Sequence, residues 1–228
     1  MKALVIAFLL LNVAGGISAQ EAHSTQDAPF HFRWSRRDAR ELDYKQTIQT
    51  SAALTPGEKR LLLEAVLHKL REQRERSEQQ FEDISDRQLR TLAANTRIEL
   101  IDLNGDGARD VIAQANGLGP CGGTGNCIVW IFELRPEGIQ ILLDSMKDRA
   151  DAFEVVTVRP WSTNGYKDIV LGSHISATER LLVSFRYSRG AYRQSACYYS
   201  TWTGAGGKRL TNPDISLYAC DNSSGQGK

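Results

Sequence analysis

The sequence predicts an α+β protein in which N-terminal amphipathic helices precede a mainly antiparallel β domain with two degenerate, blade-like repeats. Three observations predict this class. Apolar residues recur at helical spacing before residue 95. Short β-branched runs with alternating polarity dominate after residue 97. Residues 102–112 also align without gaps on residues 160–170, which indicates an internal repeat.

The chain divides into five predicted segments. Residues 1–19 read as a signal peptide, because Lys2 precedes a short apolar run and Ala19 offers a small residue before the cut. We expect residues 20–54 to be a flexible lead-in, 55–95 a helical segment, 96–222 the β domain and 223–228 a flexible tail. No segment after the signal peptide is apolar enough to cross a membrane as a helix. A secreted or periplasmic protein with no integral membrane segment after signal cleavage is therefore predicted.

The charges are balanced, with 28 basic and 27 acidic side chains. Nucleic-acid binding requires a basic surface, so the composition argues against it. The sequence leaves the partner open, as an unknown protein or glycan.

Two helix starts are predicted from capping boxes. Thr55 and Glu58 flank Pro56, which suits the first helical position, and Ser85 with Gln88 repeats the pattern. An apolar stripe follows the first start, so that helix should pack on the body of the protein. The stripe consists of Leu62, Leu63, Val66, Leu67 and Leu70.

An oxygen-rich turn lies between two predicted strands, residues 97–101 and 111–115. Its oxygen side chains stand at positions 1, 3, 5 and 9, and Gly107 at position 6 suits a tight bend. Calcium takes six to eight hard oxygen ligands from such loops, including one backbone carbonyl. The predicted ligands are Asp102, Asn104, Asp106, Asp110 and the carbonyl of Ala108. A turn rich in Asx residues that binds no metal is the alternative. The loop is not an EF-hand, because position 12 is Ala113 and the flanks are strands.

The spacing D-x-N-x-D-G-x-x-D between strands resembles the calcium loops of FG-GAP and VCBS-type repeats, known from integrin α-subunit propellers and many bacterial secreted proteins. The resemblance implies that calcium is the cofactor and that it braces a β-blade.

The repeat units are predicted at about 97–158 and 159–220. Phe132 and Gly138 match Phe185 and Gly190 at offsets of 53 and 52 residues. In the second unit only Asp168 keeps a carboxylate, so no metal is expected there. Two units are too few for a propeller of about four to eight blades. An open antiparallel sheet or small sandwich, with helices against one face or edge, fits better.

Four cysteines allow three disulfide pairings. We favour Cys121–Cys127, which closes a glycine-rich loop, and Cys197–Cys220, which ties the last strand to the penultimate one. A zinc site is the alternative, but the spacings are not those of zinc knuckles.

Three further features of the sequence are considered as functional sites. The glycine-rich stretch 117–127 lacks the ending of a phosphate loop. It could instead line a ligand groove formed by Gly122, Gly123, Thr124 and Asn126. His174 would need an unidentified partner to act as a base. A sugar-stacking surface would need Trp161, Tyr198, Tyr199 and Trp202 to gather, and packing in the core or at an edge is the alternative.

Two functions therefore stay open. The first is a non-enzymatic, calcium-binding β module that binds a partner. The second is an exported hydrolase whose active site the sequence does not reveal, and no catalytic residue is predicted.

Overall fold

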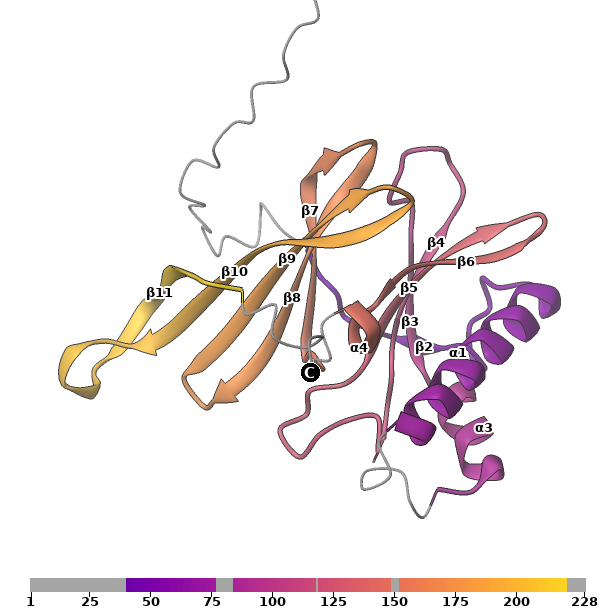
Figure 1. The fold of residues 1–228 in the computed structure, drawn as a ribbon, viewed down its shortest axis with the longest axis horizontal. Coiled ribbons are helices and arrows are strands. Elements are labelled where there is room, and N and C mark those ends of the chain that lie inside the picture. Colours follow the sequence, from indigo (N-terminus) through magenta and orange to yellow (C-terminus); the bar gives the residue numbers. More distant parts are fainter. Residues whose placement is uncertain (1–39, 77–83, 118, 149–151, 221–228) are drawn as a thin grey trace, which may run out of the picture. The chain divides into compact units, whose positions relative to one another are not determined.

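The computed structural model describes residues 40–76, 84–117, 119–148 and 152–220. They form two antiparallel sheets together with three α-helices (Figure 1). The predicted α+β class with antiparallel sheets is thus confirmed. The predicted signal peptide, the first half of the lead-in and the tail lie outside the described residues.

The five-stranded sheet has the order β2-β3-β4-β5-β6. Its strands are β2 (Gln46–Thr47), β3 (Arg97–Ile101), β4 (Asp110–Gln114), β5 (Val129–Arg135) and β6 (Gly138–Asp144).

The six-stranded sheet has the order β1-β7-β8-β9-β10-β11. Its strands are β1 (Arg40–Glu41), β7 (Val155–Thr163), β8 (Tyr166–Ser176), β9 (Glu179–Ser188), β10 (Ala191–Thr203) and β11 (Arg209–Tyr218). A 3₁₀ turn, η1 (Ala205–Gly207), lies between β10 and β11, and α4 (Ser145–Asp148) follows β6.

Both predicted capping boxes are present. The Thr55 backbone N–H donates to Glu58 Oε2 (2.6 Å) at the start of α1 (Pro56–Arg76), and the Glu58 N–H donates to Thr55 Oγ1 (3.2 Å). Ser85 and Gln88 cap α3 (Asp86–Ala94) in the same way. Capping satisfies N–H groups that have no partner inside a helix, which explains why these short patterns fix the helix starts.

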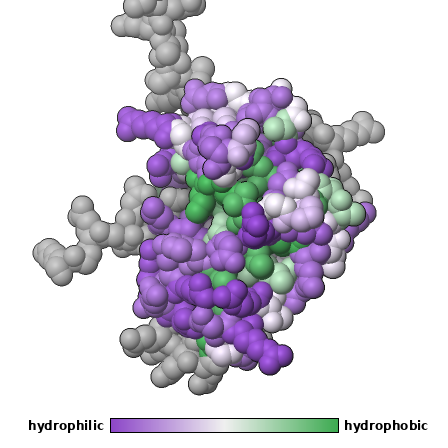
Figure 2. All heavy atoms as spheres, turned by 90° about the vertical axis from the view of Figure 1, so that its right-hand side faces the viewer, coloured by the Kyte–Doolittle hydropathy of each residue, from purple (hydrophilic) through white to green (hydrophobic). Residues whose placement is uncertain are grey.

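The apolar stripe of α1 packs as predicted. Leu62, Val66, Leu67 and Leu70 are buried in a core that also contains residues of α3 and the five-stranded sheet. On the side that bears the two helices, hydrophilic residues surround a central group of apolar ones (Figure 2). None of the helices in the described ranges is both long and apolar enough to span a membrane.

The central strands of the five-stranded sheet are buried on both faces. Val111 and Trp130 belong to the core shared with the helices, whereas Ile112 and Ile131 belong to a second core shared with the six-stranded sheet. This alternation follows from the two-residue period of a strand. The strand β5 is central in this sheet, because it lies between β4 and β6.

The internal repeat is visible in the strand registers. Val111 pairs with Phe132 between β4 and β5, and Ile169 pairs with Phe185 between β8 and β9. The first members of these pairs differ by 58 residues and the second members by 53, as in the sequence alignment. The strands β3 to β6 are therefore equivalent, in order and register, to β7 to β10. The second unit begins at Val155, before the predicted boundary at 159.

One predicted match is displaced by one residue. Arg135 pairs with Gly138 after the first turn, and Ser188 pairs with Ala191 after the second. Gly138 is therefore equivalent to Ala191 and not to Gly190. The two turns differ in chemistry: Pro136 has a fixed φ in the first, whereas Arg189 and Gly190 both have positive φ in the second (53° and 83°).

Residues 40–54 fall in the predicted flexible lead-in, but the structure includes them in the fold. In this segment β1 pairs with β7 and β2 pairs with β3. Leu42 is buried in the core between the sheets, and Ile48 in the core with the helices. The segment thus adds one short strand beside the first strand of each repeat. Its few apolar residues are enough to anchor it in the two cores.

Both predicted disulfides are confirmed, as Cys121–Cys127 and Cys197–Cys220. The described residues contain no free cysteine. The first bond closes the glycine-rich loop, and the second joins β10 to the chain just after β11.

We expect the Cys197–Cys220 bond to contribute more stability than the Cys121–Cys127 bond, because it closes 23 residues rather than 6. Constraint of the unfolded chain rises with loop length and gives about 3 kcal/mol for the longer loop. Thermal melts of the two paired Cys→Ser variants measure this. Unchanged melting in both, or a larger loss for the short loop, would contradict the expectation.

Candidate functional site

The turn between β3 and β4 is held by hydrogen bonds to its own acidic side chains. Asp102 accepts the backbone N–H groups of Gly105 (2.6 Å) and Gly107 (3.0 Å), and Asp106 Oδ1 accepts that of Ala108 (2.7 Å). Although partial burial opposes the effect, these backbone donors lower the pKa of Asp102. Gly107 has a φ of 84°, as its place at the bend predicts. The turn thus keeps Asp102 ionised.

Asp110, the first residue of β4, occupies a different environment. It is 3% exposed, and its Oδ2 accepts the Leu103 backbone N–H (2.9 Å). Its cross-strand partner is another acid, Glu133 on β5. Burial, followed by the charges of Glu133, Asp106 and Asp102, raises the pKa of Asp110 to about 6. Among the described residues, no basic side chain forms an ion pair with Asp110.

Glu133 connects the turn to the second repeat. Its Oε2 accepts hydrogen bonds from the Arg135 guanidinium (2.6 and 2.9 Å), and its Oε1 accepts the Tyr166 hydroxyl (3.1 Å). The same hydroxyl lies 3.4 Å from Asn104 Nδ2, and the Tyr166 ring stacks on Tyr187 at 3.7 Å. A hydrogen bond from the Lys167 backbone N–H to the Leu103 carbonyl (2.7 Å) adds a second link.

The equivalent position in the second repeat has the opposite charge. Asp168 corresponds to Asp110 and is equally buried, but Arg186 stands where Glu133 stands in the first repeat. The Arg186 Nε lies 3.3 Å from Asp168 Oδ2. A protein cation therefore neutralises the buried acid of the second repeat, whereas the buried acid of the first repeat faces an anion.

The second repeat has no oxygen-rich turn at this place. Pro160 and Ser162 lie within β7, and Asn164 and Gly165, both with positive φ, make a two-residue turn into β8. Asn164 donates to the Tyr187 carbonyl (2.8 Å).

The predicted ligands lie along one short turn. Asn104 Nδ2 donates to Asp106 Oδ2 (2.8 Å), whereas Asp102 and Asp110 accept backbone N–H groups. Within the described ranges, no group of three or more His, Cys, Asp or Glu side chains is gathered closely enough to hold a metal ion. The chemistry of the donors nevertheless fits calcium, because all are hard oxygens and a carboxylate oxygen has lone pairs for more than one contact. Asp102, Asn104, Asp106, Asp110 and the Ala108 carbonyl would hold the ion, and the calcium site remains a prediction.

The four residues of the predicted ligand groove have two different environments. Gly122, Gly123 and Thr124 are exposed at the tip of the loop. The Asn126 side chain instead binds the backbone of His174 on β8, donating to its carbonyl (3.0 Å) and accepting its N–H (2.9 Å). Asn126 therefore anchors the loop, and three of the four predicted residues are open to a ligand.

His174 has partners that the sequence did not reveal. Its Nδ1 lies 3.0 Å from Glu154 Oε2, and its Nε2 lies 3.4 Å from Arg180 Nη2. A general base needs a ring nitrogen directed at its substrate. Since both nitrogens face protein groups, this arrangement suits a structural role.

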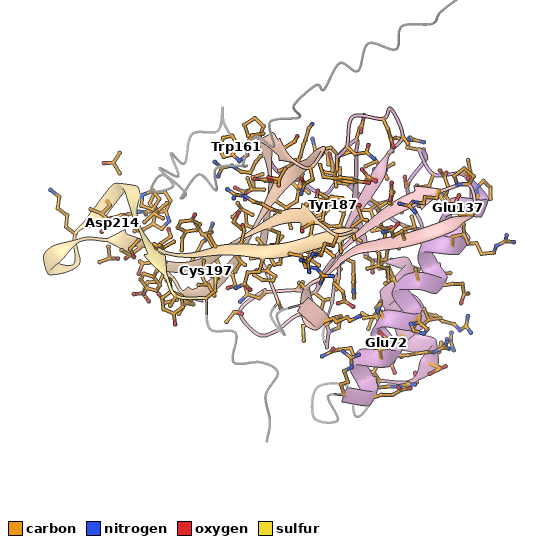
Figure 3. The ribbon with its side chains drawn as sticks, turned by 45° about the horizontal axis from the view of Figure 1, so that its top comes forward. Glu72, Glu137, Trp161, Tyr187, Cys197 and Asp214 are labelled. Atoms are coloured by element: carbon orange, nitrogen blue, oxygen red, sulfur yellow. A yellow bond between two sulfur atoms is a disulfide. The ribbon has the colours of Figure 1, made fainter. Side chains whose placement is uncertain are left out.

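The four aromatic residues considered for sugar stacking do not gather. Trp161 lies beside the β7–β8 turn, with the Arg159 guanidinium 3.9 Å from its ring, whereas Tyr199 pairs with Leu181 at the opposite end of the sheet. Figure 3 shows Trp161 well apart from Cys197, which lies on the same strand as Tyr199. Tyr198 is buried.

Comparisons of the chain with protein-family models, with curated proteins and with solved structures found no match.

We expect the metal-free protein to gain stability as the pH falls from 7 towards 5. The folded-state pKa of Asp110 is raised from 3.8 to about 6, so the folded state takes up a proton before the unfolded state does. The corresponding stability is complete below the unfolded pKa and is lost as the pH rises through 6, with a full size on the order of 3 kcal/mol. Urea melts in chelator should show this gain in the wild type and not in Asp110→Asn. Equal pH dependence in the two proteins would refute the assignment.

Proposed function

We propose that the chain is an exported β module, secreted or periplasmic, in which calcium bound at residues 102–110 braces the first repeat. In this proposal the module works by binding a protein or glycan rather than by catalysis. The calcium loop would be of the FG-GAP or VCBS type, on a pair of blade-like repeats.

The observation that carries the calcium proposal is the charge difference between equivalent positions. Asp110 and Asp168 are both buried at the start of equivalent strands, but only Asp168 has an arginine opposite. Burying an uncompensated carboxylate is costly. A divalent cation held by the adjacent oxygen-rich turn would remove that cost in the first repeat.

The contacts of the turn support a bracing role. Leu103 is hydrogen-bonded to Lys167, and Asn104 contacts Tyr166, so the turn touches the second repeat at two points. A cation that fixes the turn would therefore stiffen both sheets where they meet.

The export and binding parts of the proposal have separate support. Two disulfides suit an oxidising compartment. Sites in extracellular modules bind calcium with dissociation constants of about 10⁻⁴–10⁻³ M, which suits the calcium levels outside cells. Both ring nitrogens of His174 face protein groups, so His174 is not the general base that the hydrolase alternative would need.

Calorimetric titration of the chain without residues 1–19 tests the calcium site. After chelation and dialysis, we expect the wild type to bind calcium with a dissociation constant of about 10⁻⁴–10⁻³ M. Asp106→Ala removes one ligand and should weaken binding about tenfold or more. Asp43→Ala, which removes an exposed acid outside the turn, is the matched control and should bind normally. A flat wild-type trace would reject the site.

A further inference from the structure

The strand β11 forms one edge of the six-stranded sheet. In the described part of the chain its only sheet partner is β10. An edge strand exposes a row of backbone N–H and C=O groups that can pair with another strand. The β10–β11 hairpin, with Asp214 on it, lies at the end of the molecule away from Glu72 of α1 (Figure 3).

The second half of β11 lacks the usual protection of an edge. Natural edges are shielded by proline, lysine, bulges or short length. Pro213 lies near the middle of the strand, but residues 214–218 contain no proline or basic residue. Leu217 is 76% exposed and Tyr218 is 44% exposed. An exposed apolar strand of this kind is suited to strand addition.

This half of the strand is also firmly held. Cys197 pairs with Tyr218 across the hairpin, and the Cys197–Cys220 disulfide fixes the chain just beyond it. A partner strand would thus meet an edge that has already lost most of its conformational freedom, which lowers the entropic cost of pairing.

We propose that residues 214–218 of β11 pair antiparallel with the same residues of a second copy of this chain. The two six-stranded sheets would join edge to edge about a two-fold axis at Ser216. Such an interface is isologous, so one surface serves both partners.

The sequence of the strand favours its own copy as the partner. Ser216 is the midpoint of the proline-free run, so pairing about it uses all five residues and avoids Pro213. Ile215 of each copy then faces Leu217 of the other, which gives two apolar pairs. The small Ser216 faces Ser216 of the second copy. The two Asp214 side chains stand four positions apart along the strands, at about 13 Å, and do not repel strongly. Moving the axis to Ile215 would place Pro213 against Leu217 and lose a ladder hydrogen bond.

The interface is small, so association should depend on protein concentration. Sedimentation equilibrium of the full chain across a wide concentration range should show a monomer–dimer equilibrium. Leu217→Lys removes two apolar cross-strand pairs and should raise the dimer dissociation constant roughly two- to thirtyfold. Ile175→Lys is the matched control, because Ile175 is a 52% exposed aliphatic residue on β8, and its dimerisation should be unchanged.

Cross-linking with oxidised glutathione tests the register. Ser216→Cys should give a disulfide-linked dimer joined at residue 216, since that residue faces itself across the axis. Leu217→Cys faces Ile215 and should cross-link much less.

A chain that stays monomeric at every concentration overturns the proposal, as does equal weakening by Ile175→Lys. Preferential cross-linking at 217 overturns the register. If a monomeric chain instead captured an extended peptide along β11, the edge would serve a different partner and self-association would again be wrong.

Discussion

A carboxylate buried beside another acid is the constraint on which the first repeat depends. Asp110 begins β4, lies inside the core and faces Glu133 across the ladder. The folded protein must either keep Asp110 protonated or supply a positive charge. The second repeat meets the same requirement with Arg186, which pairs with Asp168. In the first repeat Arg135 binds Glu133 instead, so Asp110 gains no cation from the described protein groups.

The stacking of the repeats explains why this site lies where it does. The first repeat packs on the helices through Val111 and Phe132, and the equivalent residues of the second repeat, Ile169 and Phe185, lie in the core between the sheets. The second repeat thus packs on the first repeat with the same face that the first repeat packs on the helices. The helices α1 and α3 therefore cover this face of the first repeat. The turn at residues 102–110 meets the second repeat at its β7–β8 hairpin, so the state of the turn affects both units.

Local signals made much of this structure predictable from the sequence. The capping residues Thr55 and Ser85 fixed the helix starts, because their hydrogen bonds involve residues three positions away. The strands on either side of the turn were predicted to within one residue from β-branched runs. The disulfide pairs followed from the positions of the cysteines in the predicted loops and strands.

The parts that escaped prediction depend on which strands meet. Asp110 and Glu133 are 23 residues apart, and only the strand register places them together. The offset of 53 that relates Phe132 to Phe185 also relates Glu133 to Arg186, so the sequence held a signal for this pair. The strands in residues 40–54 are two residues long and have no periodicity to detect. The link between Asn126 and His174 joins a loop to a strand 48 residues away, which no local pattern specifies.

Calcium-dependent melting of two equivalent variants, Asp110→Asn and Asp168→Asn, tests the central claim most directly. If a cation does in the first repeat what Arg186 does in the second, calcium raises the melting temperature of the wild type and of Asp168→Asn but not of Asp110→Asn. In chelator, Asp110→Asn should melt above the wild type, because a like-charge contact is removed, and Asp168→Asn should melt below it, because Arg186 loses its partner. A calcium shift that is absent from the wild type, or that survives fully in Asp110→Asn, would contradict the account.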